Sequence, residues 1–183
     1  GVNGSRDAEA LAAEVQEEDL LPAPRPLRLP AGEPTTLDPT MADNVISSAK
    51  IFQLFSGLVE LRPDVGIVPD VAHSWEVLED GKKYLFHLRD DVSWSDGMPV
   101  TAGDFEYAWK RVLGNQITLT IPRLMYDIVG ARAYHQGKVS DPESVKVTAL
   151  NAVTLAVELE GPTGYFLHLL ANAVAFPCHR EVV

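Results

Sequence analysis

The chain has 183 residues, of which 46% are hydrophobic and 22% are charged, and its formal net charge is −11 at pH 7. This length is enough for one globular domain with a substantial core, or for one lobe and part of a second. The acidic balance argues against partners such as nucleic acid and anionic lipid headgroups, which both attract basic surfaces. The lone cysteine, Cys178, excludes an internal disulfide and a cysteine-based zinc site. No run reaches the roughly 18 apolar residues of a transmembrane helix.

The N-terminal residues differ in composition from the rest of the chain. Residues 1–21 are rich in Ala, Glu and Asp and predict an acidic leader. No basic segment followed by an apolar one occurs there, so we expect no signal peptide. Three prolines between Pro22 and Pro26 predict a stiff linker, because proline fits neither a helix interior nor a central strand. We therefore expect a leader and linker over 1–26 and a domain over 27–183.

The first elements of this domain are expected between residues 27 and 58. Residues 27–29 predict a short strand, and residues 30–39 predict a loop rich in Pro, Gly and Thr. A helix is expected over 45–58, with Asp43 or Asn44 as its N-cap. Its apolar side chains form a wide face that we expect to lie in the core. These residues are Ala49, Ile51, Phe52, Leu54, Phe55, Leu58 and Val59.

Two β-hairpins follow. The strands expected over 74–78 and 83–88 flank a turn that contains Asp80-Gly81, and Asp-Gly is a strong hairpin signal. A second pair of alternating segments, 145–150 and 154–159, lies around a polar turn and predicts another hairpin.

Helices are expected before and after the second hairpin. Asp96-Gly97 predicts a turn, and Thr101 with Asp104 fits a capping box that opens a helix. This helix places four apolar residues on one face, namely Phe105, Ala108, Trp109 and Val112. Further helices are expected over 126–136 and 165–173. Hairpins interleaved with helices predict an α+β fold.

No pattern for catalysis or metal binding is present. The sequence lacks a Gly-x-Ser-x-Gly elbow, a phosphate-binding glycine loop and a His-Glu-x-x-His motif. The stretch from Asp91 superficially resembles a calcium loop, but Asp96 and Ala102 stand where an EF-hand needs Gly and Glu. We expect no catalytic residue, no metal site and no cofactor. A hydrolase on an unrelated α+β fold is the enzymatic alternative.

One stretch is distinctive enough to indicate a family. Residues 92–105 read Val-Ser-Trp-Ser-Asp-Gly-Met-Pro-Val-Thr-Ala-Gly-Asp-Phe, and Tyr-Ala-Trp-Lys-Arg follows at 107–111. The pattern resembles the signature of the family 5 extracellular solute-binding proteins, which include the oligopeptide- and dipeptide-binding proteins of ABC importers. Other segments match that family in order and spacing, namely 37–39, 55–59, 68–76, 81–89 and 165–170. Because the signature consists of turn, capping and anchoring residues, it is interpreted as a determinant of the fold.

The resemblance covers about 27–183 and implies a fold and a function. The implied fold is a partial periplasmic-binding-protein-like (type II) lobe, the N-terminal lobe of a two-lobed protein, with the second lobe absent. The implied function is capture of an extracytoplasmic solute, an oligopeptide first of all, for delivery to the permease subunits of an ABC importer. The full-length protein is expected in the periplasm or at the cell surface, with attachment through a lipid anchor as one alternative. Because a cleft needs two walls, the fragment alone is expected to bind weakly or not at all.

The resemblance also implies candidate ligand-binding residues. In peptide-binding members, the loop before Leu-Asp-Pro borders the cleft, which maps onto Gly32, Glu33, Pro34 and Thr35. Glu33 could pair with an amine of the ligand, whereas Pro34 offers only its carbonyl. Many peptide binders also carry a Ser-Pro-Tyr-Ala-like stretch whose tyrosine reaches the cleft. Residues 120–123 read Thr-Ile-Pro-Arg instead, so nickel complexes, sugars and opines remain alternative ligands.

A second function remains open at this point. A solute-binding-like module can serve as the sensor of a regulatory or signalling protein, joined to it through a linker such as Pro22–Pro26. That hypothesis predicts a DNA-binding, kinase or other signalling domain in the same gene, whereas the transport hypothesis predicts transporter genes beside it.

Overall fold

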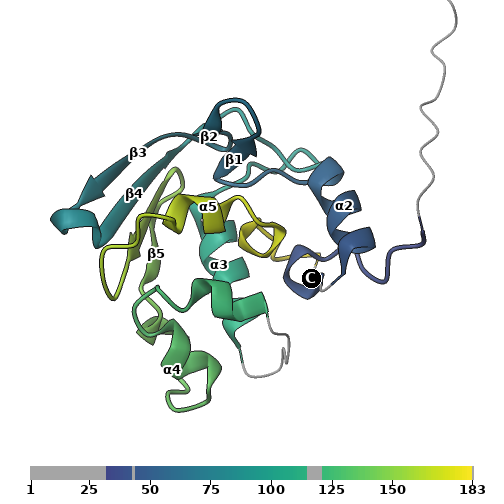
Figure 1. Cartoon of the computed structure of the whole chain (residues 1–183). Coiled ribbons are helices and arrows are strands. Elements are labelled where there is room, and N and C mark those ends of the chain that lie inside the picture. The colour runs from purple at the N-terminus through teal and green to yellow at the C-terminus, as the bar shows by residue number, and fades with distance from the viewer. Residues whose placement is uncertain (1–31, 43, 115–120, 183) are drawn as a thin grey trace, which may run out of the picture. The chain divides into compact units, whose positions relative to one another are not determined.

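A computed structural model describes residues 32–42, 44–114 and 121–182 (Figure 1). The leader, the linker and the first strand expected over 1–29 lie outside the described residues. The α-helices are α2 (Val45–Leu54), α3 (Ala102–Leu113), α4 (Ala131–His135) and α5 (Phe166–Leu170). The strands are β1 (Val59–Arg62), β2 (Gly66–Pro69), β3 (Ala72–Leu78), β4 (Lys83–Leu88), β5 (Val147–Asn151) and β6 (Thr154–Glu158).

The centre of the fold is a four-stranded antiparallel sheet in the order β3-β4-β6-β5. Both predicted hairpins are confirmed, since β3 pairs with β4 and β5 pairs with β6. The pairing of β4 with β6 joins the two hairpins into one sheet. Phe86 lies opposite Leu155 in this central pair, and both side chains are buried. The turn between β3 and β4 places Gly81 at a φ of 89°, a conformation that suits glycine and explains the Asp-Gly signal.

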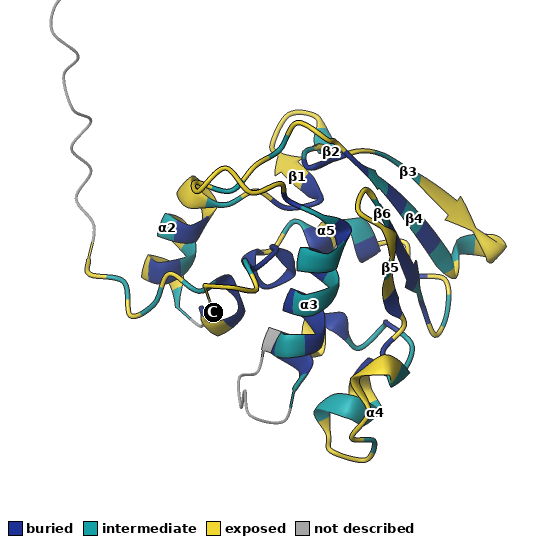
Figure 2. Cartoon of the chain, turned by 180° about the vertical axis from the view of Figure 1, so that it is seen from behind, coloured by how far each residue is buried: buried dark blue, intermediate teal, exposed yellow. Residues whose placement is uncertain are grey.

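Helix α3 packs against the sheet at β5 and β6 (Figure 2). Its predicted apolar face is confirmed, since Phe105, Ala108, Trp109 and Val112 are all fully buried. The alternating residues of β4 complete this core from the sheet side. Hairpins and helices thus form the α+β lobe that the sequence predicts.

The capping box at the start of α3 is also confirmed. The Thr101 backbone N–H donates to Asp104 Oδ2 at 2.8 Å, and the Thr101 hydroxyl donates to the same oxygen at 2.9 Å. Just upstream, the turn at Asp96-Gly97 brings the Trp94 N–H to the Met98 carbonyl at 2.8 Å. The family signature therefore acts locally, by making one turn and starting one helix.

Asp104→Ala is expected to lower the free energy of unfolding by about 1 kcal/mol, because it removes the acceptor of both bonds at the start of α3. Urea unfolding followed by circular dichroism measures this loss as a lower midpoint at an unchanged slope. Asp104→Asn is the control: it keeps an acceptor oxygen and is expected to lose less. An alanine variant as stable as the wild type would contradict the assignment.

A two-stranded hairpin, β1–β2, was not predicted. It pairs Val59 with Pro69 and Arg62 with Gly66. Only Val59 of β1 is buried, so this short strand shows no alternation that a sequence pattern could reveal. Gly66 opens β2 at a φ of 87°.

The prediction for the helix over 45–58 was partly wrong. Asn44 is an N-cap, because its side chain accepts a hydrogen bond from the Ser47 N–H, but α2 ends at Leu54. Phe55 already has an extended backbone, and the chain runs from there into β1. The expected apolar face is divided: Ile51, Leu58 and Val59 are buried, whereas Phe52 and Leu54 are 48% and 64% exposed. Helix α2 accordingly carries both buried and exposed positions (Figure 2). Within α2 only Ser47 and Ile51 are buried.

The other helices are shorter than predicted. Of the segment 126–136, only α4 is α-helical, and it follows Gly130, which has a φ of 79°. Of the segment 165–173, only α5 is α-helical, and a 3-10 turn over Ala173–Ala175 follows it. Another 3-10 turn, Pro39–Met41, ends the loop that precedes α2.

Candidate functional site

The predicted ligand-binding loop lies at the start of the described chain. Gly32, Glu33 and Thr35 are exposed and Pro34 is half-buried. Thr35 is held in place by the helix that follows, because its hydroxyl accepts a hydrogen bond from Asn44 Nδ2 at 2.8 Å. Gly32 lies close to the same helix, since a Cβ built on it would stand 2.9 Å from Cδ1 of Ile46. The structure thus places all four residues on one surface segment beside the N-terminus of α2.

A half-buried ion pair lies just behind this loop. Asp38 Oδ2 lies 2.7 Å from Nη2 of Arg111 on α3, and the Asp38 and Arg111 side chains are 16% and 26% exposed. Burial alone would raise the pKa of Asp38. Hydrogen bonds from Arg111 and Thr40 outweigh this effect and hold the pKa below its ordinary value. The ion pair therefore joins the segment that carries the loop to the central helix.

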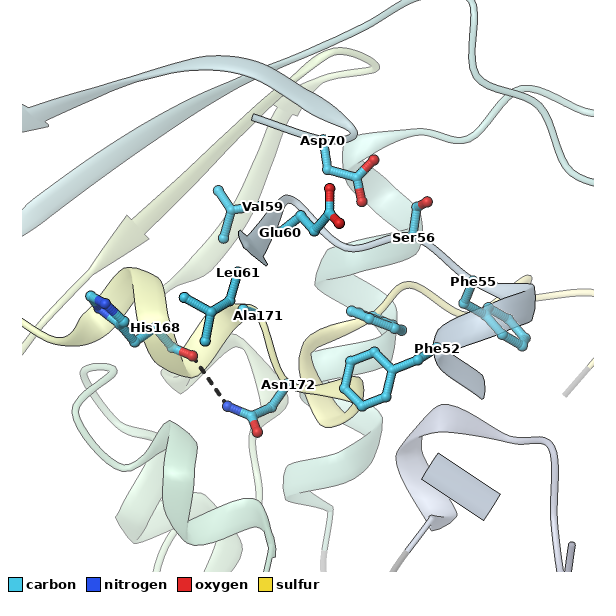
Figure 3. A pocket seen from close by; sticks show the side chains of 11 residues that line it. Phe52, Phe55, Ser56, Val59, Glu60, Leu61, Asp70, His168, Ala171 and Asn172 are labelled. Atoms are coloured by element: carbon cyan, nitrogen blue, oxygen red, sulfur yellow. Dashed lines mark hydrogen bonds between the residues drawn. The ribbon is translucent and has the colours of Figure 1, made fainter. Parts of the chain in front are cut away.

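A groove of about 550 Å³ opens between the end of α2, strand β1 and helix α5 (Figure 3). One side of it is aromatic: the rings of Phe52 and Phe176 meet edge to face, with centroids 5.4 Å apart. Glu60 and Asp70 line it as well (Figure 3). Burial raises the pKa of Asp70, and the neighbouring charge of Glu60 acts in the same direction. A cationic or hydrogen-bond-donating group would suit this groove better than an anion.

A smaller hollow of about 410 Å³ lies on the other side of Phe55. It is bordered by Trp94 of the family signature and by Cys178 and His179 near the C-terminus. The Cys178 thiol is buried, which raises its pKa to about 12, and it is therefore a poor nucleophile at neutral pH. Both hollows are bordered by Phe55, which the sequence pattern assigned to the core, and neither hollow was predicted.

One stretch singled out in the sequence lies only partly within the described residues. Thr120 of the stretch that replaces the family's tyrosine segment lies outside the described residues. Arg123, at the end of that stretch, is exposed. No metal-binding group of three or more His, Cys, Asp and Glu side chains is found within the described ranges. No helix in this part of the chain is long and apolar enough to span a membrane.

Comparison with solved structures places the fold in a class of binding proteins. The chain matches the Escherichia coli murein tripeptide binding protein MppA with a TM-score of 0.77 and 36% identity, over 82% of this chain and 30% of that one. It matches Haemophilus influenzae OppA in complex with the peptide RPPGFSPFR with a TM-score of 0.78 and 32% identity, over 84% of this chain and 30% of that one. The lobe is thus similar to part of a periplasmic peptide-binding protein.

The sequence comparisons establish the family. The model of bacterial extracellular solute-binding proteins, family 5 Middle, matches residues 66–181. The chain is 41% identical over 150 residues to the dipeptide-binding protein DppE of Bacillus subtilis. The aligned residues cover 82% of this chain and 27% of the relative. The chain belongs to the bacterial extracellular solute-binding proteins of family 5. It spans between a quarter and a third of the length of such relatives.

Proposed function

We propose that this chain is part of a protein that captures an oligopeptide outside the cytoplasm and delivers it to the permease subunits of an ABC importer. The observation that carries the proposal is the combined likeness to peptide-binding proteins: 41% identity to a dipeptide-binding relative and a TM-score of 0.78 to a peptide-bound structure. The role is binding without chemical conversion, as the family description implies.

We further propose that Gly32, Glu33, Pro34 and Thr35 form part of one wall of the binding cleft. Three of them are exposed, and the hydrogen bond from Asn44 to Thr35 fixes the segment without engaging the Glu33 carboxylate. Exposed backbone here could pair with an extended peptide by strand addition. Glu33 would then meet a cationic group of the ligand, such as its terminal amine.

The 183-residue chain is expected to bind peptides weakly or not at all, because one wall leaves most of a peptide's surface in water. Calorimetric titration with a mixture of tri- to nonapeptides measures this directly. Micromolar binding by the 183-residue chain would refute the expectation.

The same titration on the product of the whole reading frame that contains this sequence tests the function itself. Micromolar binding or tighter is expected there, and no detectable binding would count against peptide capture. Glu33→Gln in that protein is expected to weaken binding of peptides with a free N-terminus by about tenfold, the loss of one charge-assisted hydrogen bond. N-acetylated peptides are the matched control and should respond little to the substitution.

A further inference from the structure

The segment that carries the candidate loop is closed on itself by hydrogen bonds. The Thr35 N–H donates to the Ser47 hydroxyl at 3.1 Å, and the Thr35 hydroxyl lies 3.1 Å from the same oxygen. Asn44 Nδ2 adds a bond to the Thr35 hydroxyl, and its Oδ1 accepts one from the Ser47 N–H at 2.9 Å. Both ends of the segment from Thr35 to Ser47 are therefore tied together at the start of α2. We call residues 35–42 and 44–47 the closed segment.

The middle of the closed segment is fastened to α3 by a guanidinium. Arg111 Nη1 donates to Asp38 Oδ1 at 3.1 Å, and Nη2 lies 2.7 Å from Oδ2, so the pair is bidentate. Arg111 also bonds to the Thr40 hydroxyl. Asp38 Oδ1 in turn accepts from the Thr40 N–H at 2.9 Å. One side chain of α3 thus engages both polar residues at the turn Pro39–Met41.

The neighbouring residue on α3 holds a different part of the fold. Lys110 Nζ lies 2.6 Å from Glu106 Oε1 and 2.8 Å from Glu143 Oε1. Glu106 Oε2 accepts a hydrogen bond from the Ala149 N–H of β5 at 2.7 Å. Two consecutive cations on one helix therefore reach in different directions, one to the sheet edge and one to the closed segment.

We propose that Arg111 is a positioning residue for ligand capture: through Asp38 and Thr40 it fixes the closed segment, and with it the loop Gly32–Thr35, against the central helix. The proposal rests on the proposed function, since the loop is the expected cleft wall. The hydrogen bonds and the ion pair of Arg111 go to Asp38 and Thr40, and Arg111 does not line the groove of Figure 3, so we expect it to act through the segment and not on the ligand. The planar fork of arginine suits this task because it engages two carboxylate oxygens at once.

Hydrogen–deuterium exchange of the ligand-free chain tests the proposal. Arg111→Gln is expected to speed exchange at the Thr40 and Met41 amides by about tenfold, since the Asp38 side chain and carbonyl that accept them lose their anchor. The amides of β4 should exchange at the wild-type rate. Lys110→Gln is the matched control, one residue away on the same helix, and should speed exchange at the Ala149 amide without changing Thr40 and Met41.

Three outcomes would overturn the proposal. Unchanged exchange at Thr40 and Met41 in Arg111→Gln would show that the ion pair fixes nothing. An equal increase at β4 would show a loss of global stability instead of a local role. Arg111→Lys keeps the cation and should retain part of the protection, so exchange as fast as in Arg111→Gln would also count against it. Because no ligand is needed, failure here is distinguishable from failure of the peptide titrations.

Discussion

Replacing Trp109 with alanine is expected to lower the free energy of unfolding by about 3–5 kcal/mol, the range for truncating a fully buried large aromatic side chain. Trp109 is fully buried at the centre of α3, and its indole N–H donates to the Ala175 carbonyl at 2.9 Å. The substitution leaves a large cavity and also leaves that buried carbonyl without its donor. Since domains of this size have a free energy of unfolding of about 5–15 kcal/mol in total, the substitution should remove a large fraction of the stability.

Urea unfolding measures the effect, and the fluorescence of Trp75 and Trp94 provides a signal that survives the substitution. Trp109→Phe is the control: it keeps most of the ring volume and removes the hydrogen bond, so it should cost about 1–3 kcal/mol. A loss below 1 kcal/mol for Trp109→Ala would mean that α3 is not anchored through this side chain.

Local signals in the sequence were sufficient for the two hairpins of the sheet and for α3, but not for the pairing of β4 with β6 that joins the hairpins. The Asp80-Gly81 turn and the Thr101–Asp104 capping box are made by residues within four positions of one another, and both appear in the structure. The buried face of α3 follows directly from helical spacing. These features could be predicted because each depends on the backbone of a short segment.

Features that depend on distant parts of the chain could not be predicted in the same way. Asp38 and Arg111 are 73 residues apart, and nothing in either local pattern indicates that they pair. The apolar face of α2 was predicted to be core, because a hydrophobic pattern shows that a face avoids water without showing what covers it. Phe52 and Leu54 are exposed on the described lobe, and Phe52 lines the groove beside Glu60. The candidate loop was located only through the family resemblance.

Gly130→Ala is expected to be the most damaging of the glycine substitutions, at about 3 kcal/mol or more. Gly130 has a φ of 79°, which alone costs a residue with a Cβ about 1–2 kcal/mol. In addition, the new Cβ would collide with the Ser144 carbonyl oxygen and would lie 2.8 Å from its carbon. These are backbone atoms, which cannot turn aside as a flexible side chain can. The segments on either side are joined by the bond from the Lys146 N–H to the Val129 carbonyl at 3.0 Å, so a shift would disturb the approach to β5.

Gly97→Ala separates the two causes. Gly97 has a φ of 87° but no heavy atom within 4 Å of an added Cβ, so only the backbone conformation should count, at about 1 kcal/mol. Gly66 has the same φ and the same open surroundings and serves as a second control. Urea midpoints of the three variants, measured side by side, should therefore place Gly130→Ala well below the other two. Three equal midpoints would mean that the chain opens around Gly130 at little cost.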